Sequence, residues 1–318
     1  MIIETQNLSK TYKNGFKAVN QLNLHIEEGD IYGFLGPNGA GKTTTIRMLT
    51  GLIEPTEGVA YVNQENVSEK NSTIKKLIGV LPESHGYYSW MTGYEYLEYF
   101  YNLFGGDPLK AKDQINYLLD KVQLLERSNS RIGQYSRGMK QRLGLAKTLI
   151  NNPKIIFLDE PTLGLDPSGQ NDIHKLILEL NKSMNITVFI TSHLLKDIEV
   201  LCNKVAIIKD GNLLVEDTIV NLQKLHSPQE IYRIKTSDTA LAITFLKSIS
   251  GIAKMETEVD YVEVTLKNVQ ETDLIKRRIV ETLFMNHIDV FEITKVKSSM
   301  EDIFLNLVNS STTSEVKS

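Results

Sequence analysis

The chain has 318 residues, a formal net charge of -4 and 41% hydrophobic residues, so it is long enough for two domains with a sizeable core. No strongly basic region is present, and we expect no nucleic-acid partner. Cys202 is the only cysteine, which excludes an intrachain disulfide and suits a reducing compartment. The apolar runs are shorter than the ~20 residues of a membrane span, and the first residues do not form a signal peptide. We therefore expect any membrane role to come through a partner.

The N-terminal part predicts a small antiparallel sheet that leads into a buried strand. Residues 2–5 and 22–26 alternate apolar and polar side chains, as half-buried strands do, and residues 13–15 (Lys-Asn-Gly) are a turn signal between them. The continuous apolar run at 31–35 then predicts a buried strand, and residues 43–52 predict a helix.

A glycine-rich loop joins this strand to this helix, and its pattern G-x-x-x-x-G-K-T is that of a Walker A phosphate-binding loop. The loop consists of Gly36, Pro37, Asn38, Gly39, Ala40, Gly41, Lys42 and Thr43. Glycines let the backbone curl so that N–H groups point at a phosphate, and the helix N-terminus adds partial positive charge. We expect Lys42 on the outer phosphates and the Thr43 hydroxyl on Mg²⁺. The alternative is a glycine-rich turn followed by Lys-Thr by chance, which the flanking strand and helix disfavour.

The middle of the chain predicts a helical insert between two parts of a parallel-sheet core. Strands are expected at 59–62 and 78–81. Helical apolar spacing then predicts helices at 94–103, 111–125 and 139–150.

After the insert, strands and helices alternate again. The expected strands are 155–158, 186–190 and 205–208, and the expected helices are about 168–183 and 194–201. This βαβ pattern predicts a largely parallel sheet covered on both faces.

The C-terminal part predicts a second, smaller domain. Strands are expected at 230–235, 252–257, 261–267 and 290–294, and helices at 239–249, 273–284 and 299–308. The first six of these, in chain order, form the β-α-β-β-α-β pattern of the ferredoxin-like fold. The polar tail after Asn309 is expected to be disordered.

Acidic and histidine side chains follow two of the predicted parallel strands. Asp159 and Glu160 end the apolar strand 155–158, at the edge where open α/β sheets bind ligands. There Asp159 would hold Mg²⁺ as a Walker B aspartate, and Glu160 would act as general base for a water; the alternative is an acidic helix cap. His193 follows the strand 186–190 and would hold the phosphate and the water; the alternative is a structural or surface histidine.

In this order, the motifs over residues 1 to about 220 resemble those of the nucleotide-binding subunit of an ABC transporter. The family's signature motif corresponds to residues 135–142, Tyr-Ser-Arg-Gly-Met-Lys-Gln-Arg. The resemblance implies that Ser136 and the Gly138 amide contact the γ-phosphate of an ATP held by a second cassette. The motif departs from its commonest form, which has Gly at position 137 and Gln at position 139, but it keeps Ser136 and Gly138.

The resemblance assigns further nucleotide contacts. Thr44 joins the ATP-binding residues of the loop, and Tyr12 corresponds to the aromatic residue that stacks on adenine; the alternative is an ordinary exposed aromatic. Residues 163–166 correspond to the D-loop, and His193 to the switch histidine. Glu83 stands where most of the family has the Q-loop glutamine, and its carboxylate can bind Mg²⁺ or a Mg²⁺-bound water.

The stretch after Glu83 is rich in aromatic residues and Met, at positions 85–91. In the family this stretch borders the groove that receives a coupling helix from the membrane subunit. The alternative is that these side chains pack the helical insert onto the core. Together with residues 81–83 and 135–142, residues 299–304 resemble the ABC-2 exporter branch.

The resemblance implies an ATPase with ATP and Mg²⁺ as cofactors, powering export through a separate membrane-spanning permease subunit. The substrate classes of the branch are drugs, antimicrobial peptides, lipids, polysaccharides and ions. Because one chain has one Walker A loop and one signature motif, a complete site requires a homodimer or a heterodimer with a second ABC cassette. The chain would be cytoplasmic and peripheral on the inner face of the cell membrane. A second hypothesis is a soluble ABC ATPase acting on ribosomes or DNA.

The expected fold is α/β, a P-loop NTPase cassette with a parallel-sheet core, an antiparallel β subdomain and a helical subdomain, followed by a small α+β ferredoxin-like domain. The expected limits are 1–225 for the cassette, about 84–150 for its helical subdomain, 230–309 for the accessory domain and 310–318 for the tail. We expect the accessory domain to be a dimerisation or regulatory module, because it contains no recognisable cluster of ligating residues.

Overall fold

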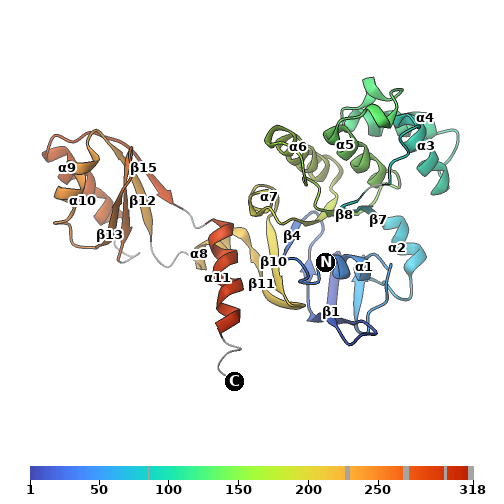
Figure 1. Cartoon of the computed structure of the whole chain (residues 1–318), viewed down its shortest axis with the longest axis horizontal. Helices are drawn as coiled ribbons and strands as arrows, with labels where there is room; N and C mark the ends of the chain where they lie inside the picture. Colours follow the sequence, from blue (N-terminus) through green and yellow to red (C-terminus); the bar gives the residue numbers. More distant parts are fainter. Residues whose placement is uncertain (85, 226–229, 268–271, 297–298, 314–318) are drawn as a thin grey trace. The chain divides into compact units, whose positions relative to one another are not determined.

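The computed structural model describes residues 1–84, 86–225, 230–267, 272–296 and 299–313 (Figure 1). Its contacts divide the chain into two compact units. The first unit is Met1–Ile219 together with the chain from Asn306 on, and the second is Val220–Leu305. No helix in the described part of the chain is long and apolar enough to cross a bilayer.

The division lies near the expected domain limits but does not coincide with them. We expected the first domain to end at 225 and the second to run over 230–309. In the structure, Lys209 Nζ donates a 2.8 Å hydrogen bond to the carbonyl oxygen of Val308. The end of the last helix therefore associates with the first unit.

A six-stranded sheet forms the centre of the first unit, in the order β11-β10-β4-β9-β8-β7. Its strands are β4 (Ile31–Leu35), β7 (Ile78–Leu81), β8 (Ile155–Asp159), β9 (Thr187–Thr191), β10 (Lys204–Lys209) and β11 (Asn212–Thr218). All neighbours are parallel except β10 and β11. The strands β4 and β9 are buried at every position, which agrees with the buried strands predicted from the apolar runs at 31–35 and 186–190.

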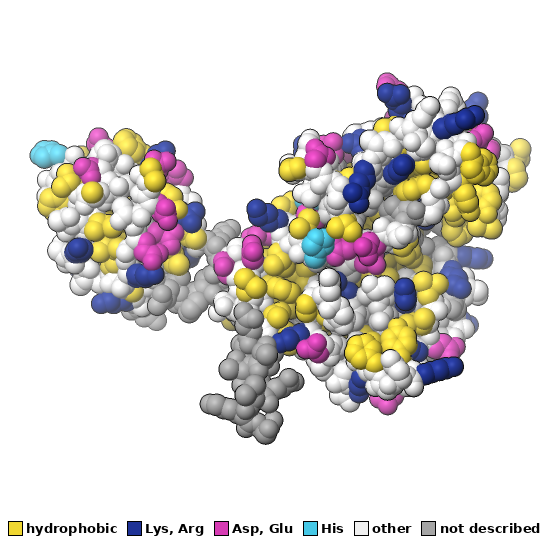
Figure 2. All heavy atoms as spheres, in the orientation of Figure 1, with side chains coloured by type: hydrophobic (Ala, Val, Ile, Leu, Met, Phe, Trp, Pro, Cys, Tyr) yellow, Lys and Arg dark blue, Asp and Glu magenta, His cyan; other side chains and the backbone are white. Residues whose placement is uncertain are grey.

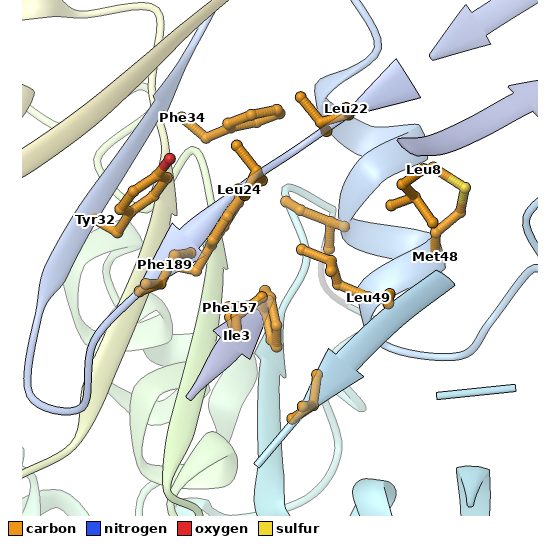
Figure 3. Packing of buried hydrophobic residues seen from close by; sticks show 14 of the residues in the cluster. Ile3, Leu8, Leu22, Leu24, Tyr32, Phe34, Met48, Leu49, Phe157 and Phe189 are labelled. Atoms are coloured by element: carbon orange, nitrogen blue, oxygen red, sulfur yellow. The ribbon is translucent and has the colours of Figure 1, made fainter. Parts of the chain in front are cut away.

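A second, antiparallel sheet packs near the first, as predicted. Its strands are β1 (Ile3–Thr11), β2 (Lys17–Leu22), β3 (His25–Ile26), β5 (Glu57–Val62) and β6 (Glu65–Asn66), ordered β2-β1-β5-β6 with β3 paired to β1. One core joins both sheets to α1 (Lys42–Leu49), and Figure 3 shows Phe34 and Phe189 around Leu24, with Met48 beside Leu8 in the same core. The Phe189 ring lies 5.3 Å from Phe34 and 5.4 Å from Phe157 between centroids, so the strands that carry the phosphate-binding loop and the acidic pair share one packed interior.

The helical part gathers around the end of the sheet away from the antiparallel strands (Figure 1). It contains α3 (Gly93–Leu103), α4 (Ala111–Lys121), the short turns η1 (Leu125–Arg127) and η2 (Ile132–Gln134), and α5 (Arg137–Thr148). Thr92 and Glu95 form a capping box that starts α3. The helix α6 (Pro167–Met184) and the short α7 (Leu195–Leu201) follow β8 and β9.

Several predicted helix limits were wrong, each for a local reason. The first helix ends at Leu49, since Gly51 takes a left-handed conformation with φ of 67°. The helix expected to reach 125 ends at Lys121, because Gln123 is also left-handed, with φ of 58°. The helix expected to begin at 139 begins at Arg137, because the Ser136 side chain caps it by accepting a hydrogen bond from the Met139 N–H. Two short helices, α2 (Asn71–Leu77) and α8 (Ile219–Leu225), were not predicted.

The second unit has the predicted β-α-β-β-α-β order. Its elements are β12 (Ile231–Thr236), α9 (Thr239–Leu246), β13 (Ile252–Thr257), β14 (Tyr261–Leu266), α10 (Thr272–Met285) and β15 (Val290–Val296). The strands form an antiparallel sheet in the order β13-β14-β12-β15 over a separate apolar core. This topology confirms the ferredoxin-like prediction. The last helix, α11 (Met300–Thr313), continues into the stretch expected to be disordered; residues 314–318 lie outside the described part.

Candidate active site

The Walker A loop curls tightly between β4 and α1. Gly41 has φ of 107°, and a Cβ atom there would lie 2.3 Å from the carbonyl oxygen of Ala18. A Cβ atom on Gly36 would lie 2.6 Å from the carbonyl oxygen of Ile208. Both positions therefore require glycine, because neighbouring backbone leaves no space for a side chain.

Lys42 lies folded back onto the loop. Its Nζ donates hydrogen bonds of 2.7 Å to the Gly36 carbonyl and 3.2 Å to the Pro37 carbonyl. The residue is only 9% exposed, and burial lowers the pKa of its ammonium group, although Glu160 and Asp159 act in the opposite direction. A desolvated cation between loop carbonyls is suited to an anion, since a phosphate supplies the negative charge that neutral carbonyls lack.

A cavity of about 260 Å³ lies over this loop. The predicted site residues that line it are Asn38, Gly39, Gly41, Lys42, Thr43, Thr44, Glu83, Asp159 and Glu160. The loop residues Gly36, Pro37 and Ala40 build the turn without lining the cavity. The structure thus brings the Walker A side chains, the Q-loop position and both acidic residues into one place.

Thr191 fixes the orientation of Asp159. The two residues are paired across β9 and β8, and the Thr191 hydroxyl donates a 2.6 Å hydrogen bond to Asp159 Oδ1. Sequence reasoning missed Thr191. Its position at the end of an apolar strand, two residues before His193, was the available signal.

Glu160 and His193 form a pair at the same edge of the sheet. Glu160 Oε2 accepts a 3.2 Å hydrogen bond from the His193 backbone N–H and lies 2.7 Å from His193 Nδ1. The Glu160 backbone is left-handed, with φ of 53°, and its N–H donates to the Thr191 carbonyl at 3.1 Å. A left-handed backbone at a glutamate is uncommon and costs free energy, and such positions cluster at functional sites.

The oxygen atoms at the cavity suit Mg²⁺. Thr43, Glu83 and Asp159 supply a hydroxyl and two carboxylates to one space, and Mg²⁺ is typically held by one or two carboxylates together with phosphates and water. In the described part of the chain, no three His, Cys, Asp or Glu side chains are grouped to hold a metal ion by themselves. The donor set therefore fits an ion that arrives with a nucleotide.

Two aromatic residues lie near the cavity. The Tyr12 hydroxyl lies 3.3 Å from Thr44 Oγ1, and Lys10 Nζ is 5.9 Å from the centre of the Tyr12 ring. Phe16, which lines the cavity, was not among the predicted site residues. The available sequence signal was an aromatic residue directly after the Lys-Asn-Gly turn.

The signature residues lie elsewhere. Ser136 and Gly138 line a separate cavity of about 450 Å³ together with Gly164 and Asp166 of the D-loop. The Ser136 hydroxyl caps α5 by accepting a 3.2 Å hydrogen bond from the Met139 N–H. Within one chain, these residues and the Walker A loop do not line the same cavity, which agrees with a site completed by a second copy.

The aromatic stretch after Glu83 has two roles in the structure. The Tyr87 hydroxyl donates a 2.5 Å hydrogen bond to the Lys140 carbonyl, and burial raises the pKa of that hydroxyl. Trp90, by contrast, is 67% exposed, and its ring lies 6.0 Å from that of Tyr88. Part of the stretch therefore packs the helical insert, and part faces outward; residue 85 lies outside the described residues.

A separate apolar groove of about 280 Å³ is lined by residues of α2, α3, α5 and β7, and its lining includes none of residues 86–91. It is lined by residues that include Leu52, Phe100, Phe104, Lys75 and Lys147. Lys147 Nζ lies 5.3 Å from the centre of the Phe100 ring. Figure 2 shows hydrophobic side chains gathered at the surface near α3.

Comparison with known proteins agrees with this geometry. A family profile described as "ABC transporter" matches residues 19–163. The bacitracin transport ATP-binding protein BcrA of Bacillus licheniformis is 38% identical over 98% of both chains, and its namesake in Enterococcus faecalis is 38% identical over 78% of both. A solved dimer of the ATP-binding cassette MJ0796 with ADP and Pi is 28% identical, covers 69% of this chain and 99% of its own, and has a TM-score of 0.61. The chain therefore belongs to the ABC transporter family, as one of its ATP-binding and ATP-hydrolysing subunits.

Proposed function

We propose that this chain drives export of an antimicrobial peptide across a membrane, in complex with a separate membrane-spanning permease subunit. The bacitracin transport ATP-binding proteins support this proposal, since their similarity extends over 98% and 78% of the chain. The permease would select the substrate, and this chain would supply the free energy of ATP hydrolysis. The permease would also hold the chain at the inner face of the membrane.

In the proposed site, Lys42 and the loop N–H groups bind the phosphates of ATP. Thr43 and Asp159 hold Mg²⁺, and Glu83 offers a further oxygen to the ion or to its water. When bound, Mg²⁺ neutralises negative charge on the β- and γ-phosphate oxygens. Tyr12 and Phe16 are the candidates for stacking on adenine, because one contacts Thr44 and the other lines the cavity.

The observation that carries the hydrolytic role is the Glu160–His193 pair. Two contacts from His193, through its backbone N–H and through Nδ1, orient the Glu160 carboxylate beside Asp159 and Lys42. In this position Glu160 accepts a proton from the water that attacks the γ-phosphate. His193 contacts the γ-phosphate and keeps the water aligned with it.

A second cassette completes the proposed site. Ser136 and Gly138 present a hydroxyl and a helix N-terminus from a cavity distinct from the Walker A cavity. They would contact the γ-phosphate of an ATP bound to the other copy, whether identical or related. The similar cassette MJ0796, solved as a dimer with ADP and Pi, supports this arrangement.

The groove lined by Leu52, Phe104 and Lys147 is the proposed contact with the permease. Its occupant is an amphipathic helical segment of the permease that buries apolar side chains against Leu52 and Phe104. Among the described residues, two lysines and no acidic residue line the groove, so a carboxylate on that segment would complement its charge.

The decisive test is Glu160→Gln in the full chain. Amide substitution keeps the size of the side chain and removes its ability to take a proton. We expect ATP binding to persist, hydrolysis to be lost and an ATP-bound dimer to accumulate. Hydrolysis is measured as phosphate release, and the dimer by size-exclusion chromatography with ATP. Glu28→Gln, at an exposed glutamate, is the matched control.

Unchanged hydrolysis in Glu160→Gln would remove Glu160 from the role of base. Transport is tested separately, by purifying the tagged chain from detergent-solubilised host membranes. A polytopic membrane protein that copurifies supports the exporter, whereas soluble partners alone, with ATPase activity retained, would overturn it.

A further inference from the structure

A buried carboxylate lies behind the Glu160–His193 pair. Asp197, on α7, is 2% exposed. One of its oxygens accepts hydrogen bonds from the Thr162 hydroxyl and, at 3.3 Å, from the Ser192 hydroxyl. Its other oxygen lies 3.0 Å from Nε2 of His174, which is also buried.

These donors come from three separate elements. Thr162 follows Glu160 by two residues in the loop after β8, and Ser192 directly precedes His193 in the loop after β9. His174 lies on α6. Asp197 therefore joins the two loops that carry the base and the histidine, and it anchors both of them to α6.

Backbone contacts carry this anchoring further along each loop. The Ser192 hydroxyl also accepts a 3.0 Å hydrogen bond from the Leu194 N–H. The Thr162 carbonyl accepts a 3.1 Å hydrogen bond from the N–H of Leu165 in the D-loop. The two residues whose hydroxyls bind Asp197 thus also accept hydrogen bonds from backbone N–H groups within their own loops.

Asp197 is arranged to remain ionised. Burial by itself would raise its pKa, but hydrogen bonds from His174, Thr162 and Ser192 lower the pKa below its ordinary value. A buried charge costs free energy unless donors surround it, and here all the donors among the described residues come from the segments around the site. His174 Nδ1 has no hydrogen-bond partner there, so the imidazole is held through Nε2.

We infer that Asp197 is a positioning residue for ATP hydrolysis, which holds the Glu160 loop and the His193 loop in register through Thr162 and Ser192. The inference rests on the roles proposed for Glu160 and His193. It requires that losing the hydrogen bonds to Asp197 displaces Glu160 relative to the γ-phosphate, while the Walker A loop keeps its conformation. Turnover would then fall without loss of ATP affinity.

The test uses Thr162→Val and Thr162→Ser in the full chain. Valine keeps the shape of the buried threonine and removes the donor to Asp197, whereas serine keeps the hydroxyl. We expect Thr162→Val to lower kcat by about 10- to 100-fold, the range for a misplaced catalytic group, with KM and ATP affinity unchanged. Thr162→Ser should recover most of the lost kcat.

Thr5→Val is the matched control. Thr5 is as deeply buried, and its hydroxyl donates to the Leu22 carbonyl and accepts from the Leu24 N–H, both at 2.8 Å. It does not contact the Glu160 or His193 loops, so Thr5→Val should lower thermal stability without changing kcat. Asp197→Asn and Ser192→Ala extend the series; if Asp197→Asn does not fold, the hydroxyl variants still decide.

If Thr162→Val and Thr5→Val had the same kcat and lost similar thermal stability, the inference would be overturned. The hydrogen bonds around Asp197 would then have a purely structural role. Equal kcat values for the valine and serine variants would overturn it as well. Glu160→Gln is measured in parallel. If Glu160→Gln hydrolyses ATP normally, the proposed site fails; if it is inactive while Thr162→Val is fully active, only the positioning role fails.

Discussion

The Thr191 hydroxyl donates a 2.6 Å hydrogen bond to Asp159 Oδ1 across two adjacent parallel strands. Because this contact orients a proposed Mg²⁺ ligand, its loss should lower the affinity of the site for Mg²⁺. Thr191→Val is expected to raise the Mg²⁺ concentration for half-maximal ATPase activity by about 10-fold, the lower range for partners of metal ligands. The measurement is a Mg²⁺ titration of phosphate release at saturating ATP.

Thr191→Ser keeps the donor and should titrate like the unchanged chain. Thr187→Val is the matched control, since Thr187 is buried on the same strand and its hydroxyl accepts a hydrogen bond from the Gly29 N–H. Identical Mg²⁺ titrations for Thr191→Val and Thr187→Val would show that Thr191 does not orient the ligand.

Asp197 should make the stability of the chain depend on pH. Its pKa is lowered from the ordinary 3.8 in the folded state, so its contribution is fully present above the unfolded pKa and is lost as pH falls through the folded value. Asp197→Asn is expected to cost about 1.5–3 kcal/mol of unfolding free energy near neutral pH, as for a hydrogen bond to a charged group. The difference from the unchanged chain should shrink below about pH 4.

The measurement is chemical denaturation at a series of pH values, followed by a signal from the first unit. A difference between the two chains that stays constant down to acid pH would mean that Asp197 is not held ionised by its donors.

The sequence predicted the elements whose signals are local. The apolar runs of β4 and β8 predicted buried strands. The Walker A pattern predicted the glycine at position 41, where neighbouring backbone leaves no space for a side chain. The short helix α2 was missed because, among its side chains with described burial, only Ile74 is fully buried, so it has no apolar stripe to recognise.

The contacts that sequence reasoning missed are long-range. Thr191 and Asp159 are 32 residues apart, and Thr162 and Asp197 are 35 apart, so neither pair forms a motif with fixed spacing. Phe16 lines the cavity because the strand that follows it, β2, lies against the Walker A loop at Ala18. Strand order and register bring such residues together, and one sequence does not specify them at the level of side chains.

The groove provides a prediction about the permease. Leu52→Asp should abolish copurification with the permease, because it places a charge on the apolar surface against which the partner packs. ATP binding and hydrolysis by the isolated chain should persist, since Leu52 does not line the Walker A cavity. Leu109→Asp, at a leucine that is 91% exposed and outside the groove, is the matched control. Undiminished copurification of Leu52→Asp would exclude this groove as the contact.

Gly164 and Arg137 link the D-loop to the signature helix. Gly164 has φ of 69°, and a Cβ atom on it would lie 2.3 Å from Arg137 Cζ. Gly164→Ala therefore adds a left-handed alanine, at a cost of about 1 kcal/mol, and displaces the guanidinium, which can move because it ends a flexible side chain. We expect weaker ATP-dependent dimerisation, measured in the Glu160→Gln background by size-exclusion chromatography.

The double variant Arg137→Gly with Gly164→Ala separates the two effects. Removing the guanidinium relieves the clash but leaves the backbone cost, so the two substitutions should be non-additive, with the pair dimerising better than the sum of the single losses predicts. Strictly additive losses would mean that Arg137 does not determine the position of the D-loop. In that case Arg137, which stands where the commonest form of the motif has glycine, would affect dimerisation independently of its contact with Gly164.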